Sequence, residues 1–121
     1  VKYKYNTVRP ETVINQYIDI NWRPYLQTPA FPEYTCGHST ISSAAAEALT
    51  SVYGDNFAYT DSTELEFGIA NRSFKSFRHA ADENNWARFY GGLHFHNSCI
   101  ISTDIGQKVG KHIATKLKIK K

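Results

Sequence analysis

The chain has 121 residues and a mass of 13.8 kDa, with 41% hydrophobic and 21% charged residues. This length fits one small domain, and this composition supports a packed core and excludes wholesale disorder. The net charge of +3 is too small to indicate nucleic-acid binding by itself, and the only dense basic run is residues 116–121. No apolar run reaches the roughly 18 residues that a membrane span needs.

Four segments have helical patterns, and the first covers about Lys2 to Asp19. Its apolar face is formed by Val13, Ile14, Tyr17 and Ile18. Pro10 lies inside this segment, so the helix either kinks or starts there. Prolines at positions 24, 29 and 32 then predict an extended or turning connection over residues 21–34.

The second helix is predicted from near His38 to just before Gly54. Its apolar residues recur every three or four positions: Ile41, Ala45, Leu49 and Val52. Residues 56–71 form a long connection with strand-like residues but no clean alternation. A connection of that size is usually functional or disordered.

The third helix is predicted to begin with Ser73 as its N-cap and to end near Tyr90, before two glycines. The fourth covers roughly residues 98–117, with apolar residues at four-residue spacing: Ile101, Ile105, Val109 and Ile113. Gly106 and Gly110 lie one turn apart and would allow another helix to approach closely. The sequence therefore predicts an all-α bundle with long irregular connections.

The start of the second helix is the first candidate anion site. Free backbone N–H groups and the helix dipole attract phosphate-like anions there. Gly37 lets the backbone approach a ligand, and His38 is placed to exchange a proton. The alternative is an ordinary capped helix whose His38 is a surface residue.

Two further groups of residues could bind the same anion. Arg88 offers a planar fork for a tetrahedral oxyanion, and His94 follows the double-glycine turn. Lys2 and Arg9 lie two helical turns apart, and hence on one face of the predicted first helix. Alternatively, Arg88 forms an ion pair on the surface and His94 is an ordinary turn histidine. Lys2 and Arg9 would then lie on a solvated basic face.

Three short motifs follow one another along the chain: K-x6-R-P at 2–10, T-C-G-H at 35–38 and A-R-x5-H at 87–94. In order and spacing they resemble the three motifs of the superfamily that joins vanadium-dependent haloperoxidases and type 2 phosphatidic acid phosphatases. The flanking residues 31–34 and 90–93 fit as well. The resemblance implies a helical bundle of the acid phosphatase and vanadium haloperoxidase type.

The resemblance also implies a role for each motif residue. Three cations would neutralise the equatorial oxygens of vanadate or phosphate: Lys2, Arg9 and Arg88. The N–H of Gly37 would donate to the anion next to Cys36. His94 would be the ligand of vanadium in vanadate or the nucleophile that forms a phosphohistidine, and His38 would be the acid or base.

Two chemistries follow from this resemblance. With vanadate as cofactor, hydrogen peroxide would oxidise a halide to a hypohalous acid. Alternatively, a soluble acid phosphatase would hydrolyse a phosphate ester and would need no cofactor. The long connections are similar to those of bacterial haloperoxidase-like members, which favours the first reading and a periplasmic or secreted location. No nucleic-acid partner is expected.

Three positions depart from the motifs. Cys36 stands for a serine and is a weaker hydrogen-bond donor that peroxide can oxidise. Ala87 stands for the serine before the arginine. Ser98 stands where an aspartate often follows the essential histidine, and such an acid orients the histidine. These departures motivate a third hypothesis, a non-catalytic relative.

Methionine is absent even at position 1, and no signal-peptide pattern begins the chain. We therefore expect residues 1–121 to be a C-terminal catalytic segment of a longer helical domain. Its helices would pack on N-terminal helices missing from this segment, and a homo-oligomer is compatible with that arrangement.

Overall fold

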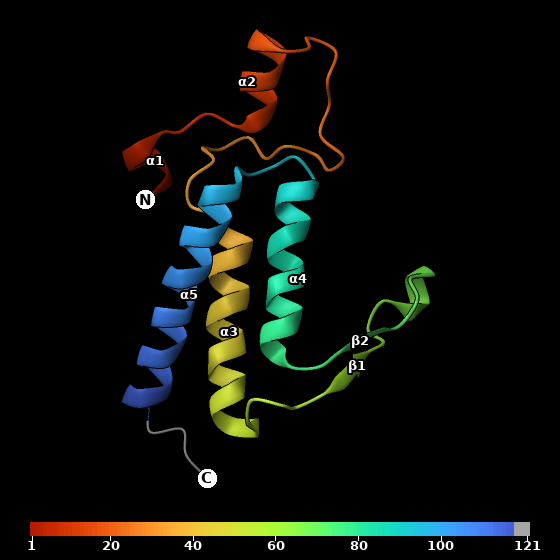
Figure 1. Ribbon diagram of the computed structural model, residues 1–121, viewed down its shortest axis with the longest axis vertical. Helices are drawn as coiled ribbons and strands as arrows, with labels where there is room; N and C mark the ends of the chain where they lie inside the picture. The colour runs from red at the N-terminus through yellow and green to blue at the C-terminus, as the bar shows by residue number, and fades with distance from the viewer. Residues whose placement is uncertain (118–121) are drawn as a thin grey trace.

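A computed structural model describes residues 1–117, so positions 118–121 of the basic run lie outside the described part (Figure 1). The elements in order are α1 (Lys2–Tyr5), α2 (Pro10–Tyr17), α3 (Gly37–Tyr53), β1 (Tyr59–Asp61), a 3-10 turn (Leu65–Phe67), β2 (Arg72–Phe74), α4 (Phe77–Tyr90) and α5 (His96–Lys116). The predicted helical bundle is confirmed. Within the described residues, no helix is both long and apolar enough to cross a membrane.

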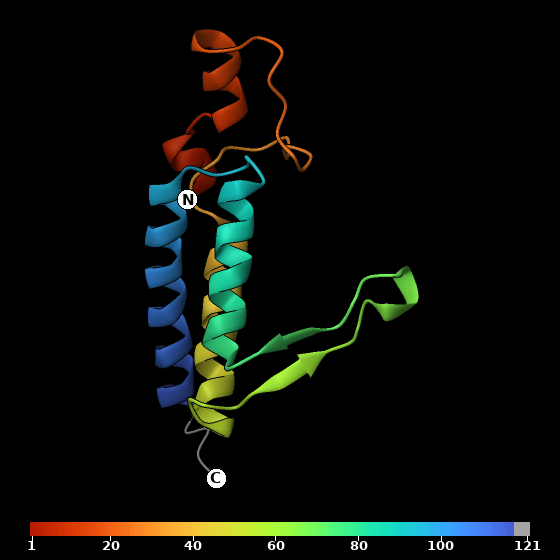
Figure 2. The ribbon, with the colours of Figure 1, turned by 45° about the vertical axis from the view of Figure 1, so that its right-hand side comes forward.

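The three long helices form the body of the molecule, and α3 packs against both α4 and α5. Figures 1 and 2 show α3 and α5 running in one direction and α4 running in the other. The start of α3, the end of α4 and the start of α5 therefore lie at one end of the bundle. The segment that carries α1 and α2 covers this end.

Small residues bring α3 and α5 close together. A Cβ added to Gly106 would overlap the carbonyl oxygen of Thr40, and one added to Gly110 would overlap that of Ala44. The predicted close approach at these glycines is confirmed, with α3 as the partner. Hydroxyl groups also line this interface, since Ser43 and Ser102 are buried in it.

The apolar stripes that predicted the helices point largely outward. Ile41 is 71% exposed, and Leu49 and Val109 are also exposed. The buried apolar side chains of the described residues are few and mostly small: Cys36, Ala46, Ala81, Leu93 and Cys99. The three-helix body thus presents a large apolar surface to its surroundings.

The predicted first helix is two helices. Asn6 adopts a left-handed conformation with φ of 46°, which ends α1 after one turn. Arg9 is extended, and Pro10 is the first residue of α2. The expectation that Lys2 and Arg9 share one helical face is therefore wrong, because an extended segment separates them.

The predicted start of the third helix is also wrong, since Ser73 lies in β2, opposite Thr60 of β1. The cap is Ser76, whose Oγ accepts a hydrogen bond from the N–H of His79 at 3.1 Å. The two strands form a hairpin that projects from the bundle (Figure 2). Cross-strand pairing here outweighed the local helical pattern before Phe77.

Candidate functional site

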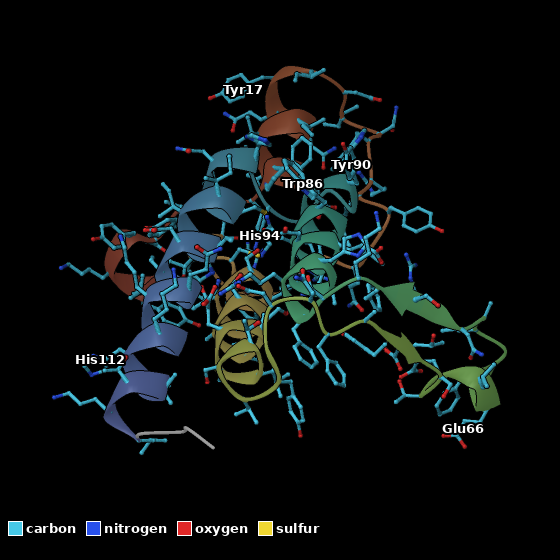
Figure 3. All side chains as sticks on the ribbon, turned by 60° about the horizontal axis from the view of Figure 1, so that its bottom comes forward. Tyr17, Glu66, Trp86, Tyr90, His94 and His112 are labelled. Atoms are coloured by element: carbon cyan, nitrogen blue, oxygen red, sulfur yellow. The ribbon has the colours of Figure 1, made fainter. Side chains whose placement is uncertain are left out.

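His94 lies at the end of the bundle where α3, α4 and α5 meet, in the short connection between α4 and α5 (Figure 3). Its side chain is only 4% exposed. Nη1 of Arg9 donates to its Nε2 at 3.1 Å, and its Nδ1 lies 2.7 Å from Oε1 of Glu33. Because arginine has no acceptor atom, Nε2 carries a lone pair and Nδ1 carries the proton that Glu33 accepts.

Two opposing effects act on the pKa of His94. Burial lowers it, whereas hydrogen bonds with Cys36 and Glu33 raise it, and the net change is upward. A carboxylate on one ring nitrogen makes the other nitrogen more basic. Nε2 is therefore a strong electron-pair donor at the centre of the site.

Arg9 is buried against backbone carbonyl groups from two distant segments. Nη1 donates to the carbonyl of Leu93 at 2.9 Å, and Nε donates to that of Phe31 at 3.1 Å. The guanidinium carbon also lies 5.1 Å from the centre of the Phe31 ring. These contacts fix the guanidinium beside Nε2 of His94.

Lys2 supports the connection before α3. Its ammonium donates to three carbonyl oxygens, those of Pro32 at 3.0 Å, Glu33 at 3.0 Å and Thr35 at 2.7 Å. Those bonds use all three of its N–H groups. Lys2 thus holds the loop that precedes Cys36.

The start of α3 combines a buried sulfur with an open backbone. Cys36 is fully buried, and its N–H donates to Oγ of Ser102 at 2.9 Å. Its Sγ accepts a hydrogen bond from Ser39 at 3.0 Å. A Cβ added to Gly37 would meet nothing within 4 Å, so the space beside this first residue of α3 is open.

Hydrogen bonds lower the pKa of the Cys36 thiol. The largest effect comes from the Cys99 thiol, burial opposes it, and His94 and Ser39 add to the lowering. The same contact raises the pKa of Cys99. Of the two buried thiols, Cys36 is therefore the one whose thiolate form is stabilised.

His38 and Arg88 complete the constellation. His38 is exposed in the first turn of α3, and its pKa is lowered by burial and by the charge of Arg88. Arg88 is half-buried in the last turn of α4, and its Nε is enclosed without a hydrogen-bond partner among the described residues. A buried, unpaired guanidinium N–H indicates a place for an acceptor.

Known proteins resemble this chain in sequence and in fold. Residues 18–120 match the family model described as the VCPO second helical-bundle domain. The chain belongs to the vanadium haloperoxidase superfamily.

Three solved structures similar to this superfamily member are of bacterial proteins. A vanadium-dependent iodoperoxidase superposes with a TM-score of 0.91 at 51% identity, over 95% of this chain and 28% of that chain. A vanadium-dependent chloroperoxidase in its holo form gives 0.78 at 21% identity, over 98% and 32% of the two chains. Its apo form gives 0.77 at 19%, over 95% and 31%. No curated protein matches the chain.

The residues of this superfamily member fit a tetrahedral oxyanion. Two helices, α3 and α5, begin at this end of the bundle and direct their positive dipole ends toward it. Nε of Arg88 is a donor without a partner among the described residues, and the open space beside Gly37 gives an anion access to the first backbone N–H groups of α3. Nε2 of His94 supplies a lone pair. This donor set suits an anion whose central atom accepts one nitrogen ligand.

One site residue was missed by sequence reasoning. Glu33 supplies the carboxylate that faces His94, from the loop before α3. Ser98, where an aspartate was expected, donates to Oε2 of Glu33 at 2.9 Å. The sequence did contain a signal for Glu33. It is an acidic residue three positions before Cys36, in a chain that has serine at position 98 where an acid was expected. Ala87, which stands for the other motif serine, is exposed.

Proposed function

We propose that the intact protein containing this chain is a vanadium-dependent haloperoxidase that uses hydrogen peroxide to oxidise a halide. The observation that carries the proposal is the buried His94, whose Nε2 accepts a hydrogen bond from the guanidinium of Arg9 while Glu33 faces Nδ1. The 51% identity to a bacterial iodoperoxidase supports the same chemistry. Iodide is therefore the halide to test first.

The proposed roles divide between anion binding and proton transfer. Nε2 of His94 and the donors of Arg9, Arg88 and Gly37 would hold vanadate, which supplies a centre that activates peroxide. The positive charge is preorganised in a largely buried site, where it stabilises a reacting oxyanion more than it would in water. His38, exposed in the first turn of α3, exchanges a proton at the oxygen that faces solvent.

A pair of assays tests the proposal on the intact protein. We expect vanadate, peroxide and iodide to give halogenation of a phenol-type dye, and excess phosphate to abolish it by competing for the site. His94→Ala removes the proposed ligand and should abolish turnover. His112→Ala is the matched control, since this histidine lies exposed on α5 (Figure 3).

Two other outcomes would contradict the proposal. Hydrolysis of a chromogenic phosphate ester that vanadate inhibits, with no halogenation, would identify a phosphatase in which His94 attacks phosphorus. Failure to turn over either substrate would identify a non-catalytic relative.

We further propose that the exposed apolar stripes of α3 and α5 pack against additional helices of the intact protein. The stripes include Ile41, Leu49, Val109 and Ile113. The chain spans 28% of the iodoperoxidase chain, so the relative contains a large additional part. Burying such surface contributes about 25 cal/mol per Å².

A further inference from the structure

The carboxylate of Glu33 is the most enclosed charged group of the site, with a side chain only 1% exposed. Oε1 accepts hydrogen bonds from Nδ1 of His94 at 2.7 Å and from the N–H of Phe95 at 3.2 Å. Oε2 accepts one from Oγ of Ser98 at 2.9 Å. Three donors therefore hold this carboxylate in one orientation.

The backbone of Glu33 is fixed as firmly as its side chain. Its N–H donates to the carbonyl of Thr7 at 3.0 Å, and its own carbonyl accepts from Lys2 at 3.0 Å. The chain segments before α2, before α3 and before α5 thus converge on this residue. A carboxylate held from three sides can impose an orientation on a neighbouring ring.

The position of Ser98 explains why the acid comes from elsewhere. Ser98 lies four residues after His94, in the first turn of α5, and its hydroxyl contacts the carboxylate instead of the histidine. A carboxylate at position 98 would occupy the neighbourhood that Oε2 of Glu33 now fills. A serine at position 98 therefore leaves room for the carboxylate of Glu33 and donates a hydrogen bond to it.

We propose that Glu33 is the positioning residue of His94: its carboxylate fixes the proton on Nδ1 and the ring orientation, and Ser98 holds the carboxylate in place. This inference rests on the proposed function, in which Nε2 of His94 binds the anion. Glu33 acts through the histidine and does not itself touch the anion. It supplies, from the loop before α3, the acid that is absent at position 98.

The test uses the intact protein and vanadate as the probe. Glu33→Gln keeps the side-chain shape and removes the charge, and we expect it to weaken vanadate binding about 10–100-fold. Ser98→Ala removes the hydroxyl alone and should cause a smaller loss in the same direction. Glu66→Gln is the matched control, because this exposed glutamate lies on the hairpin far from His94 (Figure 3).

A rescue variant separates positioning from general stability. We expect the double variant Glu33→Gln with Ser98→Asp to regain most of the lost affinity, since it returns a carboxylate to the neighbourhood of Nδ1. A merely structural role for Glu33 predicts no regain. No regain in a folded double variant, or a Glu33→Gln variant that binds vanadate within twofold of the parent, would overturn the proposal.

Nitrogen-15 NMR of the histidine side chains gives a readout that needs no vanadate. In the parent protein His94 should show the proton on Nδ1, and in Glu33→Gln the Nδ1 signal should shift because a neutral amide replaces the charged acceptor. Unchanged signals would overturn the positioning role. If the parent protein fails to bind vanadate, the proposed function fails alone, and these signals still decide the role of Glu33.

Discussion

Nη1 of Arg9 donates to Nε2 of His94 at 3.1 Å, across a sequence separation of 85 residues. The contact joins the segment before α2 to the connection between α4 and α5. It also occupies the lone pair that the proposed function assigns to an anion. Binding must therefore move the guanidinium slightly, from the ring nitrogen to an oxygen of the anion.

Replacing Arg88 separates anion binding from folding. Because Nε of Arg88 has no hydrogen-bond partner within residues 1–117, Arg88→Met should leave the free energy of unfolding nearly unchanged. Vanadate affinity should fall by about 10–100-fold, the worth of a charge-assisted hydrogen bond. Titration with vanadate checks this, and Arg72→Met on the hairpin is the control. Equal affinity in both variants would contradict the assignment of Arg88.

Gly106 should tolerate no side chain. In Gly106→Ala the new Cβ meets the Thr40 carbonyl of α3, so the helices must separate and the protein should lose about 1–3 kcal/mol of stability. Thermal unfolding measures the loss. The control is Gly37→Ala, whose Cβ would enter open space, and this variant should keep its melting temperature. A Gly106→Ala protein as stable as the parent would refute the close helix contact.

Cys36→Ser restores the hydroxyl of the motif. The serine can keep the hydrogen bond to Ser39 and donates more strongly than a thiol, so anion affinity should rise roughly fivefold. Activity should also survive prolonged peroxide better, because an oxidisable sulfur is gone from the motif. Residual activity after peroxide exposure is the measurement, with Cys99→Ser as control. A non-catalytic relative would gain no activity from this substitution.

Stability at low pH should depend on the ion pair between Glu47 and Arg78. Nε and Nη2 of Arg78 donate to the two Glu47 oxygens at 2.8 and 2.9 Å, and these bonds lower the pKa of Glu47 below 4.5. The stabilisation is complete above pH 4.5 and disappears as the pH falls through the lowered pKa. Glu47→Gln should cost about 1–3 kcal/mol at pH 7.

Denaturant titrations of parent and Glu47→Gln proteins at several pH values check that window. The difference in unfolding free energy should be largest at neutral pH and should shrink below pH 4.5, where the parent glutamate becomes protonated. A difference that is constant with pH would exclude the charged pair as its cause.

Produced as residues 1–121 alone, the chain should aggregate or bind hydrophobic dyes. Ile41, Leu49 and Val109 lie on surfaces that water would contact. Ile41→Lys together with Leu49→Gln should raise its solubility. A monomeric parent chain with cooperative unfolding, measured by sedimentation and calorimetry, would contradict the proposed packing on further helices.

Helix identity was largely predictable, because local patterns such as the spacing of Ile41 and Leu49 set it. The end of α1 at Asn6 and the pairing of Ser73 with Thr60 were not. The end of α1 depends on the left-handed conformation of Asn6, and the position of Ser73 depends on pairing between two strands. The local spacing of apolar residues indicates neither. The direction of the apolar stripes was equally beyond reach, since burial depends on neighbouring helices.

The motif residues of the site could be proposed from their spacing, but their contacts could not. Arg9 meets His94 only because α2 and the loop before α3 fold over one end of the bundle. Glu33 lies 61 residues from His94 in sequence, and no periodic pattern relates them. Lys2 is predicted to bind the anion, and its contacts with three backbone carbonyls depend on where the loop before α3 runs.

The glycine contacts between α3 and α5 also control the position of the helix that begins next to His94. Gly110 lies 14 positions beyond the start of α5, about 20 Å along the helix at 1.5 Å per residue. A bulkier residue there would tilt α5 and shift the helix that begins just after His94, without touching any group of the site. A substitution at Gly110 should therefore change the geometry around His94 from the far end of the bundle.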